Sequence, residues 1–187
     1  MARYGDIATP FKEIDIVKPV DPYGVSKVAA ENILSILSKT HGIEYNIAVP
    51  HNIIGPKQKY NDPFRNVASI MINLILQNRQ PIIYGDGNQT RDYIYVKDVV
   101  AALVISASKN ENLFLNIGTG VETSVNQLVS SMQKEFKSEI EPIFAEARDG
   151  ELKRSVLSNK LAMEKLNWVP EYTLSQGMQK VFEWLKT

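Results

Sequence analysis

A helical stretch near the N-terminus constrains the fold more than any other part of the sequence. Apolar residues recur with helical spacing over residues 22–40, Pro22 suits the first turn, and Gly42 suits the position after the last turn. Residues 44–49 then end in a nearly continuous apolar run, which is typical of a strand buried in a parallel sheet. A helix joined to such a strand predicts an α/β fold.

Tyr23 and Lys27 lie four residues apart in this helix, so their side chains project from one face. A nearby ammonium group favours the phenolate over the phenol, so Lys27 is expected to make Tyr23 easier to ionise. A tyrosine tuned in this way can exchange a proton with a sugar hydroxyl. The same spacing also occurs on ordinary helix surfaces, so the neighbouring motifs have to decide between the two interpretations.

The composition argues against several classes of function. Lys plus Arg and Asp plus Glu each number 21 among 187 residues, so no net charge marks a nucleic-acid or membrane surface. Cys is absent, and His41 and His51 are the only histidines, so we expect no disulfide, no thiol catalysis and no histidine-based zinc site. The sequence has no signal peptide and no apolar run of about 20 residues, which predicts a cytoplasmic protein.

The remaining elements follow from local periodicity and capping patterns. Residues 50–63 read as a long polar loop, and Asp98 is expected to cap a helix over residues 99–108. Ser124 with Gln127 and Thr173 with Gln176 have the spacing of capping boxes. Further helices are predicted over residues 67–76, 160–166 and 174–185, and strands over residues 81–84, 92–96, 113–117 and 140–145.

The stretch from Asp21 to Lys27, followed by Ala29, Ala30 and Glu31, resembles the active-site helix of the extended short-chain dehydrogenase/reductase family. The similarity is greatest to nucleotide-sugar epimerases and dehydratases. In that family the tyrosine is the acid/base and the lysine holds the nicotinamide ribose. The resemblance therefore implies a catalytic role for Tyr23 and Lys27, and contacts of both with NAD.

The resemblance covers only part of the family's fold. No glycine-rich turn of the kind that approaches the dinucleotide pyrophosphate occurs in the sequence. Tyr4-Gly5 is similar to the end of the family's Ser-Ser-x-x-x-Tyr-Gly segment, whose catalytic Ser or Thr would precede residue 1. We therefore expect a C-terminal fragment of a Rossmann-type enzyme. Residues 1–50 would be the last elements of the NAD-binding domain, and residues 51–187 the small α/β nucleotide-sugar-binding domain.

The loop that follows the strand of residues 44–49 lies where ligands bind in open α/β sheets. Its sequence, from Pro50 to Pro56, resembles the family's Asn-Val-Tyr-Gly-Pro loop. The resemblance implies that Asn52 contacts the sugar diphosphate and that Pro50 and His51 lie near the nicotinamide. A lone histidine is more often packed than catalytic, so proton transfer by His51 is not favoured.

The run from Tyr84 to Asp98 resembles the family's Gly-Asp-Gly-x-Gln-x-Arg-Asp motif almost residue for residue. Arg91 would clamp the diphosphate, because a guanidinium group matches phosphate oxygens bidentately. Ile82 and Tyr84 would flank the nucleobase. Asp92 is interpreted as a structural hydrogen-bond anchor.

Two further segments carry implied substrate contacts. Asn66, at the start of a helix, would bind the diphosphate, as helix N-termini often do. Arg148 and Glu151 resemble the family's Arg-x-Gly-Asp/Glu motif. The resemblance implies that Arg148 is a second clamp for the diphosphate and that Glu151 accepts hydrogen bonds from the ribose hydroxyls. Ser155 stands where a small residue leaves room for an N-acetyl group, although it could instead start a solvent-facing strand. Asn159 replaces the family's usual Asp and can still cap a helix.

The resemblance implies part of an NAD-dependent nucleotide-sugar 4-epimerase that acts on a UDP-sugar or dTDP-sugar. The proton would move to Tyr23 while hydride moves to NAD, through a 4-keto sugar. A dehydratase or decarboxylase on the same scaffold is the alternative within enzymes. The alternative that is not an enzyme is a remnant protein that binds nucleotide sugars without turnover. The isolated chain is expected to be inactive. The Tyr23 helix and the strand of residues 44–49 are expected to expose apolar surface, and the helix is expected to support a homodimer.

Overall fold

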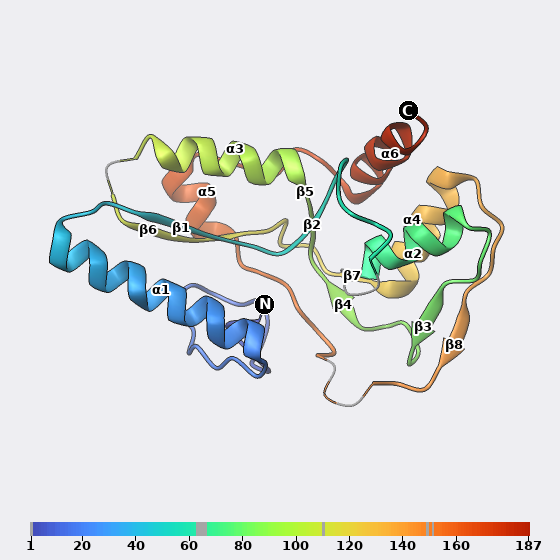
Figure 1. Ribbon diagram of the computed structural model, residues 1–187, viewed down its shortest axis with the longest axis horizontal. Coiled ribbons are helices and arrows are strands. Elements are labelled where there is room, and N and C mark those ends of the chain that lie inside the picture. The colour runs from blue at the N-terminus through green and yellow to red at the C-terminus, as the bar shows by residue number, and fades with distance from the viewer. Residues whose placement is uncertain (1, 63–66, 110, 149, 151) are drawn as a thin grey trace.

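The computed structural model describes residues 2–62, 67–109, 111–148, 150 and 152–187. Helices and strands are interspersed along the chain (Figure 1). In order, they are α1 (Pro22–His41), β1 (Asn46–Pro50), β2 (Asn52–Ile54), α2 (Val67–Leu76), β3 (Ile82–Tyr84), β4 (Thr90–Arg91), β5 (Tyr93–Tyr95), α3 (Val96–Ala107), β6 (Leu113–Ile117), β7 (Thr123–Ser124), α4 (Val125–Phe136), β8 (Ile143–Ala145), α5 (Lys160–Leu166) and α6 (Leu174–Leu185).

Within the described residues the strands form four pairs, three of them parallel, and this confirms the α/β class. β1 pairs with β6, so that Asn46 lies opposite Leu113 and Pro50 opposite Ile117. β2 pairs with β5, β3 pairs with β8, and the antiparallel pair joins β4 to β7. Each pair joins segments that are far apart in the sequence, so loops from distant parts of the chain lie close together at the strand ends.

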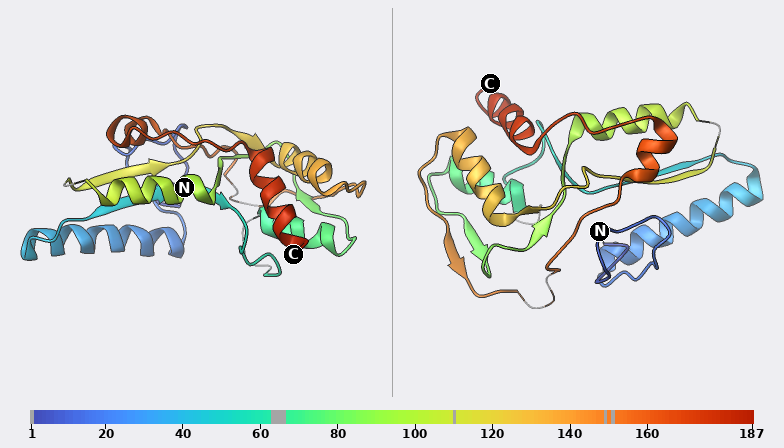
Figure 2. Two further views of the ribbon diagram at one scale, coloured as in Figure 1. Left: turned by 90° about the horizontal axis from the view of Figure 1, so that it is seen from above. Right: turned by 180° about the vertical axis from the view of Figure 1, so that it is seen from behind.

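Two of the three hydrophobic clusters among the described residues give the molecule two lobes. One cluster packs α2, α4 and α6 against β3 and the ends of β2 and β5. The other packs α3 and α5 against β6 and includes the buried Trp168. Figures 1 and 2 show these groups side by side, with β2 and β5 between them. Ile54 belongs to the first cluster and Ile94 to the second, so the β2–β5 pair joins the two lobes.

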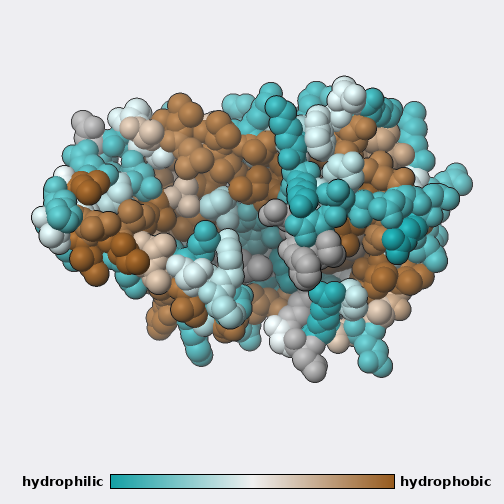
Figure 3. All heavy atoms as spheres, viewed as in Figure 1, coloured by the Kyte–Doolittle hydropathy of each residue, from teal (hydrophilic) through white to brown (hydrophobic). Residues whose placement is uncertain are grey.

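Helix α1 has strong capping signals at both ends but buries little of its surface. The Asp21 carboxylate accepts a hydrogen bond from the Gly24 amide at 2.6 Å, and Gly42 ends the helix in the left-handed conformation at φ 65°. Gly24 is the only buried residue of the helix. Its exposed apolar side chains confirm the apolar surface expected on the helix; they are Val25, Ile33, Leu34, Ile36 and Leu37. Figure 3 shows this surface together with that of α3. On β1, by contrast, residues 46–49 are only partly exposed.

Three predictions about local structure are wrong. Helix α3 begins at Val96 after Tyr95, so Asp98 lies inside the helix rather than capping it. Its buried carboxylate accepts hydrogen bonds from the backbone amides of Glu171 at 3.0 Å and Tyr172 at 3.2 Å. The segment expected to be a loop contains β2, which depends on pairing with β5. Asn159 makes no side-chain cap, because its amide donates instead to the Gly118 carbonyl at 2.9 Å.

The other local signals agree with the structure. Both capping boxes are present, at Ser124 with Gln127 and at Thr173 with Gln176. The helices predicted over residues 67–76, 160–166 and 174–185 have the bounds that their patterns indicate. Among the described residues, no helix combines the length and the apolar character needed to cross a bilayer.

Candidate functional site

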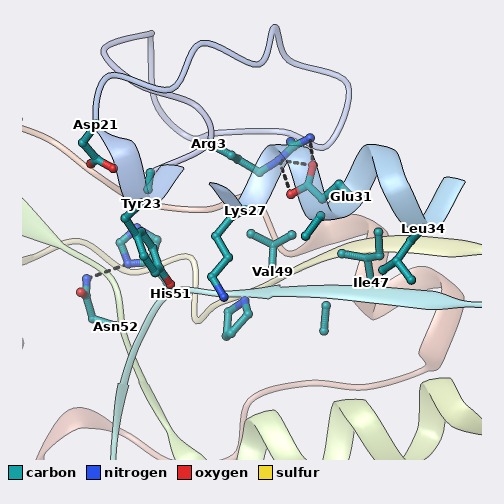
Figure 4. A pocket seen from close by; sticks show the side chains of 14 residues that line it. Arg3, Asp21, Tyr23, Lys27, Glu31, Leu34, Ile47, Val49, His51 and Asn52 are labelled. Atoms are coloured by element: carbon teal, nitrogen blue, oxygen red, sulfur yellow. Dashed lines mark hydrogen bonds and ion pairs between the residues drawn. The ribbon is translucent and has the colours of Figure 1, made fainter. Parts of the chain in front are cut away.

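Helix α1 presents Tyr23 and Lys27 to a cleft of about 520 Å³ between α1 and the C-terminal end of β1. The Tyr23 side chain is 64% exposed, and the Lys27 ammonium lies 5.3 Å from the centre of its ring. Figure 4 shows both side chains directed from α1 toward β1. Helical spacing therefore brings a phenol and an ammonium group to the same accessible wall.

Residues at the end of β1 form the opposite wall of this cleft. Pro50, His51 and Asn52 line it, as do apolar side chains from both elements, Ala30, Leu34, Ile47, Ala48 and Val49. The structure thus brings five of the predicted site residues to one cleft. They come from two segments: Tyr23 and Lys27 from the helix, and Pro50 to Asn52 from the strand end.

His51 is a buried structural residue with only 5% of its surface exposed. Its Nδ1 lies 2.9 Å from the Asp92 carbonyl oxygen and its Nε2 lies 2.8 Å from the Ser155 hydroxyl. A carbonyl can only accept, so Nδ1 carries the ring proton and Nε2 accepts from Ser155. Burial lowers the pKa of His51 to about 3, which leaves the imidazole neutral at physiological pH.

The hydrogen bonds of His51 connect three separate parts of the chain. They join the end of β1 to Asp92 and to Ser155, which lies 104 residues further along. The side-chain amide of Asn52 also lies 2.8 Å from Nδ1 of His51. Because both ring nitrogens are occupied inside the protein, His51 positions its neighbours rather than exchanging protons.

Asp92 is the second buried anchor, and its predicted structural role agrees with its contacts. Its carboxylate accepts hydrogen bonds from the Thr119 amide at 2.9 Å, the Thr119 hydroxyl at 2.6 Å and the Gly120 amide at 3.0 Å. Burial raises the pKa of Asp92, and these donors oppose the rise by favouring its charged form. The turn after β6 is thereby held against β5.

Arg91 lies in β4, half-buried, next to Asp92. Its Nη1 donates to the carbonyl oxygens of Thr90 at 2.8 Å and Leu152 at 2.9 Å. The Thr90 amide donates to the Lys153 carbonyl at 2.9 Å. These bonds tie the guanidinium group to the segment that carries Arg154 and Ser155.

A second group of predicted residues gathers at β3. The guanidinium carbon of Arg148 lies 3.8 Å from the centre of the Tyr84 ring, although the two residues are 64 positions apart. Ile82 is partly exposed on the same strand. These residues and Arg91 are not among those that line the cleft at α1. Asn66 and Glu151 lie outside the described residues.

Ser155 is fully buried, and its hydroxyl is the partner of His51 Nε2. It therefore does not face solvent, and it is not part of the lining of the α1 cleft. Its proposed position beside the sugar stays a prediction. Over the described parts of the chain, no three His, Asp or Glu side chains come close enough to hold a metal ion.

Arg3 and Glu31 form an ion pair that lines the cleft at α1 and that the sequence analysis did not predict. Arg3 donates through Nε to the two Glu31 oxygens at 3.1 and 3.2 Å, and through Nη2 to Oε2 at 2.9 Å. Its guanidinium carbon lies over the rings of Tyr4 and Phe114, at 4.7 and 4.4 Å from their centres. The spacing of Glu31 from Lys27 was a visible signal, but nothing local assigns Arg3 as its partner.

Comparison with known proteins agrees with this geometry. A model of the GDP-mannose 4,6-dehydratase family matches residues 2–181. A putative UDP-glucose 4-epimerase of Methanocaldococcus jannaschii is 42% identical over 95% of this chain and 57% of its own length. The chain therefore spans less than two thirds of this relative.

Solved structures agree over the whole chain. A UDP-N-acetylglucosamine 4-epimerase of Methanobrevibacter ruminantium, in complex with UDP-N-acetylmuramic acid, has a TM-score of 0.93 and 29% identity over 99% of this chain and 60% of its own. A UDP-glucose 4-epimerase of Thermus thermophilus in complex with NAD has a TM-score of 0.86 and 27% identity, over 99% and 61%. These matches confirm the resemblance to Rossmann-type nucleotide-sugar epimerases and dehydratases, and the chain belongs to the GDP-mannose 4,6-dehydratase family.

Proposed function

We propose that the chain forms the nucleotide-sugar-binding part, with the active-site helix, of an NAD-dependent UDP-sugar 4-epimerase. The observation that carries this proposal is the meeting of Tyr23 and Lys27 with residues 50–52 across one cleft. The relatives and solved structures named above act on, or are bound to, UDP-sugars, which supports the same substrate class here.

The cleft fits one end of NAD. An ammonium group and a phenol side by side suit a ribose diol, and the volume of about 520 Å³ is adequate for a ribose with its nicotinamide ring. Pro50 and His51 would border that ring. The sequence has no glycine-rich turn for the pyrophosphate, so this chain's own residues fit only the nicotinamide end. When bound, NAD would supply the oxidation of the sugar C4 and its reduction.

Tyr23 would exchange a proton with the C4 hydroxyl, since its phenol is exposed at the cleft. Lys27 would hold the ribose and keep a positive charge beside the phenol. Asn52, which follows the buried His51 at the end of β1, would contact the diphosphate. Each role needs only a side chain that already faces the cleft.

Arg91 and Arg148 would hold the diphosphate, with Asn66 and Glu151 as further contacts to the diphosphate and the ribose. Tyr84 and Ile82 would flank the nucleobase. The stacking of Arg148 on Tyr84 supports a shared role for these two residues, because it keeps the cation next to the proposed base site. Uracil fits the named relatives, and a dTDP-sugar remains the alternative substrate.

Several assignments extend this proposal. Ser155 would leave room for an N-acetyl group, so both UDP-hexoses and UDP-N-acetylhexosamines are proposed substrates. The exposed apolar side chains of α1 support a homodimer. A cytoplasmic location fits the sugar-nucleotide substrate. A boundary near residue 50 would separate the cofactor part from the substrate part, although β1 pairs with β6 across that boundary.

Two alternatives have support of their own. The matching family model carries the name of a 4,6-dehydratase, which supports a dehydratase on the same scaffold. The absence of a glycine-rich turn supports a chain that binds nucleotide sugars without turnover. Product analysis separates these alternatives from the epimerase.

The test is a chimera that joins this chain to the preceding part of the M. jannaschii relative. We expect it to interconvert UDP-glucose and UDP-galactose, whereas the isolated chain shows no turnover. Tyr23→Phe should abolish the activity, while the matched control Tyr45→Phe, outside the cleft lining, should retain it. An active Tyr23→Phe chimera would contradict the proposal, and a 4-keto-6-deoxy product would identify a dehydratase.

A further inference from the structure

Helix α1 places three titratable side chains along one face. Tyr23, Lys27 and Glu31 follow one another at intervals of four residues, and all three line the cleft. Lys and Glu at this spacing on a helix are well placed to form an ion pair. Such a pair would occupy the ammonium group that the proposed function assigns to the nicotinamide ribose.

Glu31 is paired with Arg3 instead. Three hydrogen bonds of 2.9–3.2 Å join the guanidinium group to both carboxylate oxygens. The Arg3 and Glu31 side chains are 8% and 17% exposed, so water screens this pair less than an exposed pair on the helix surface. Bidentate geometry makes arginine a stronger partner for a carboxylate than lysine.

The surroundings of Arg3 keep Glu31 in place. The rings of Tyr4 and Phe114 hold the guanidinium group by stacking, and its Nη1 is buried without a hydrogen-bond partner. Glu31 is therefore the group that compensates the buried charge. If its carboxylate swung toward Lys27, it would leave a cation uncompensated inside the protein, which is strongly unfavourable. Figure 4 shows Lys27 directed away from the ion pair and toward β1.

We propose that Arg3 is a positioning residue for the cleft, which sequesters Glu31 and so leaves the Lys27 ammonium group free for a ligand. This inference rests on the proposed function only for the identity of that ligand. Arg3 lies outside the helix that carries the Tyr-x-x-x-Lys pattern, and its contribution acts through Glu31.

The test measures how fast Lys27 is acetylated by an amine-reactive ester in the purified chain. Mass spectrometry gives the rate relative to Lys39, an exposed lysine in the last turn of α1. Without Arg3, the Glu31 carboxylate is released to form an ion pair with the Lys27 side chain, which slows its acetylation. Arg3→Met should lower the rate ratio about twofold, which is the size expected from an exposed helix ion pair. Arg3→Met/Glu31→Gln should restore the parent ratio.

Two results would overturn the proposal. One is an unchanged ratio in Arg3→Met, and the other is a ratio that stays low in the double variant, because the loss would then reflect altered packing. If circular dichroism shows that Arg3→Met does not fold, Arg3→Gln replaces it. That variant replaces the charged, bidentate partner of Glu31 with a neutral and shorter amide, so the same twofold fall is expected, and an unchanged ratio contradicts the proposal. Labelling requires neither NAD nor substrate, so failure of the proposed function would leave this result unaffected.

Discussion

The buried His51 should make the stability of the protein depend on pH in a way that one substitution removes. Its pKa falls from 6.5 to about 3 on folding, because burial disfavours the imidazolium ion. The unfolded chain therefore binds more protons between these two values. The contribution of the neutral His51 to the unfolding free energy is fully present above about pH 6.5 and is lost as the pH falls toward 3.

The magnitude follows from the two pKa values. At pH 4.5 the unfolded histidine is almost fully protonated and the folded one is almost fully neutral. Linkage then gives a loss of about 2.7 kcal/mol between neutral pH and pH 4.5, because each pH unit contributes about 1.4 kcal/mol. The raised pKa of Asp92 acts in the opposite direction, since it favours the folded state as the carboxyl group is protonated. Only the difference between the parent chain and a His51 variant isolates the histidine.

Urea unfolding at pH 7 and pH 4.5, followed by circular dichroism, provides the assay. The loss of unfolding free energy between these pH values should be smaller by about 2–3 kcal/mol in His51→Gln than in the parent. His41→Gln is the matched control for the substitution itself, because this second histidine is exposed at the end of α1. Equal losses in the parent and His51→Gln would refute the assignment of a buried neutral imidazole.

Further predictions concern binding, stability and association. Arg91→Ala and Arg148→Ala should each weaken UDP binding by about 1.5–3 kcal/mol, and unchanged calorimetric affinity would remove both from the site. Asp98→Ala should lower the unfolding free energy by about 2–3 kcal/mol, because the backbone amides of Glu171 and Tyr172 lose their buried, charged acceptor; a smaller urea effect contradicts this. Ile36→Lys should abolish concentration-dependent sedimentation if α1 mediates self-association. In the complete enzyme, Ser155→Tyr should lower the specificity constant for UDP-N-acetylglucosamine, and an unchanged value would exclude Ser155 from the sugar pocket.

Elements with their own capping and periodic signals could be predicted from the sequence. The helix over residues 174–185 is an example, because Thr173 and Gln176 form a capping box within one turn. Asp98 shows where this reasoning fails. An Asp near a helix start resembles a cap, but the donors to its carboxylate lie more than 70 residues away, at Glu171 and Tyr172. Likewise, the three residues of β2 form a strand only because β5 lies beside them.

The candidate site likewise contains residues that local sequence patterns predict and residues that they do not. Tyr23 and Lys27 could be placed together because helical geometry alone relates them. Their meeting with Pro50 to Asn52 was implied by the family resemblance and not by local pattern. Arg3 with Glu31 and His51 with Ser155 were missed as pairs, because contacts across 28 and 104 residues have no local signature.

The two buried anchors explain how strand ends hold the proposed ligand contacts. Successive side chains of an extended segment point in opposite directions, so a buried residue places its neighbour on the other side. The buried His51 is followed by Asn52, which is partly accessible. The buried Asp92 is preceded by Arg91, which is also partly accessible. His51 also contacts the Asp92 carbonyl, so the two anchors support one another. Protonation or replacement of His51 should therefore disturb Asn52 and Arg91 together, although His51 itself needs no contact with a ligand.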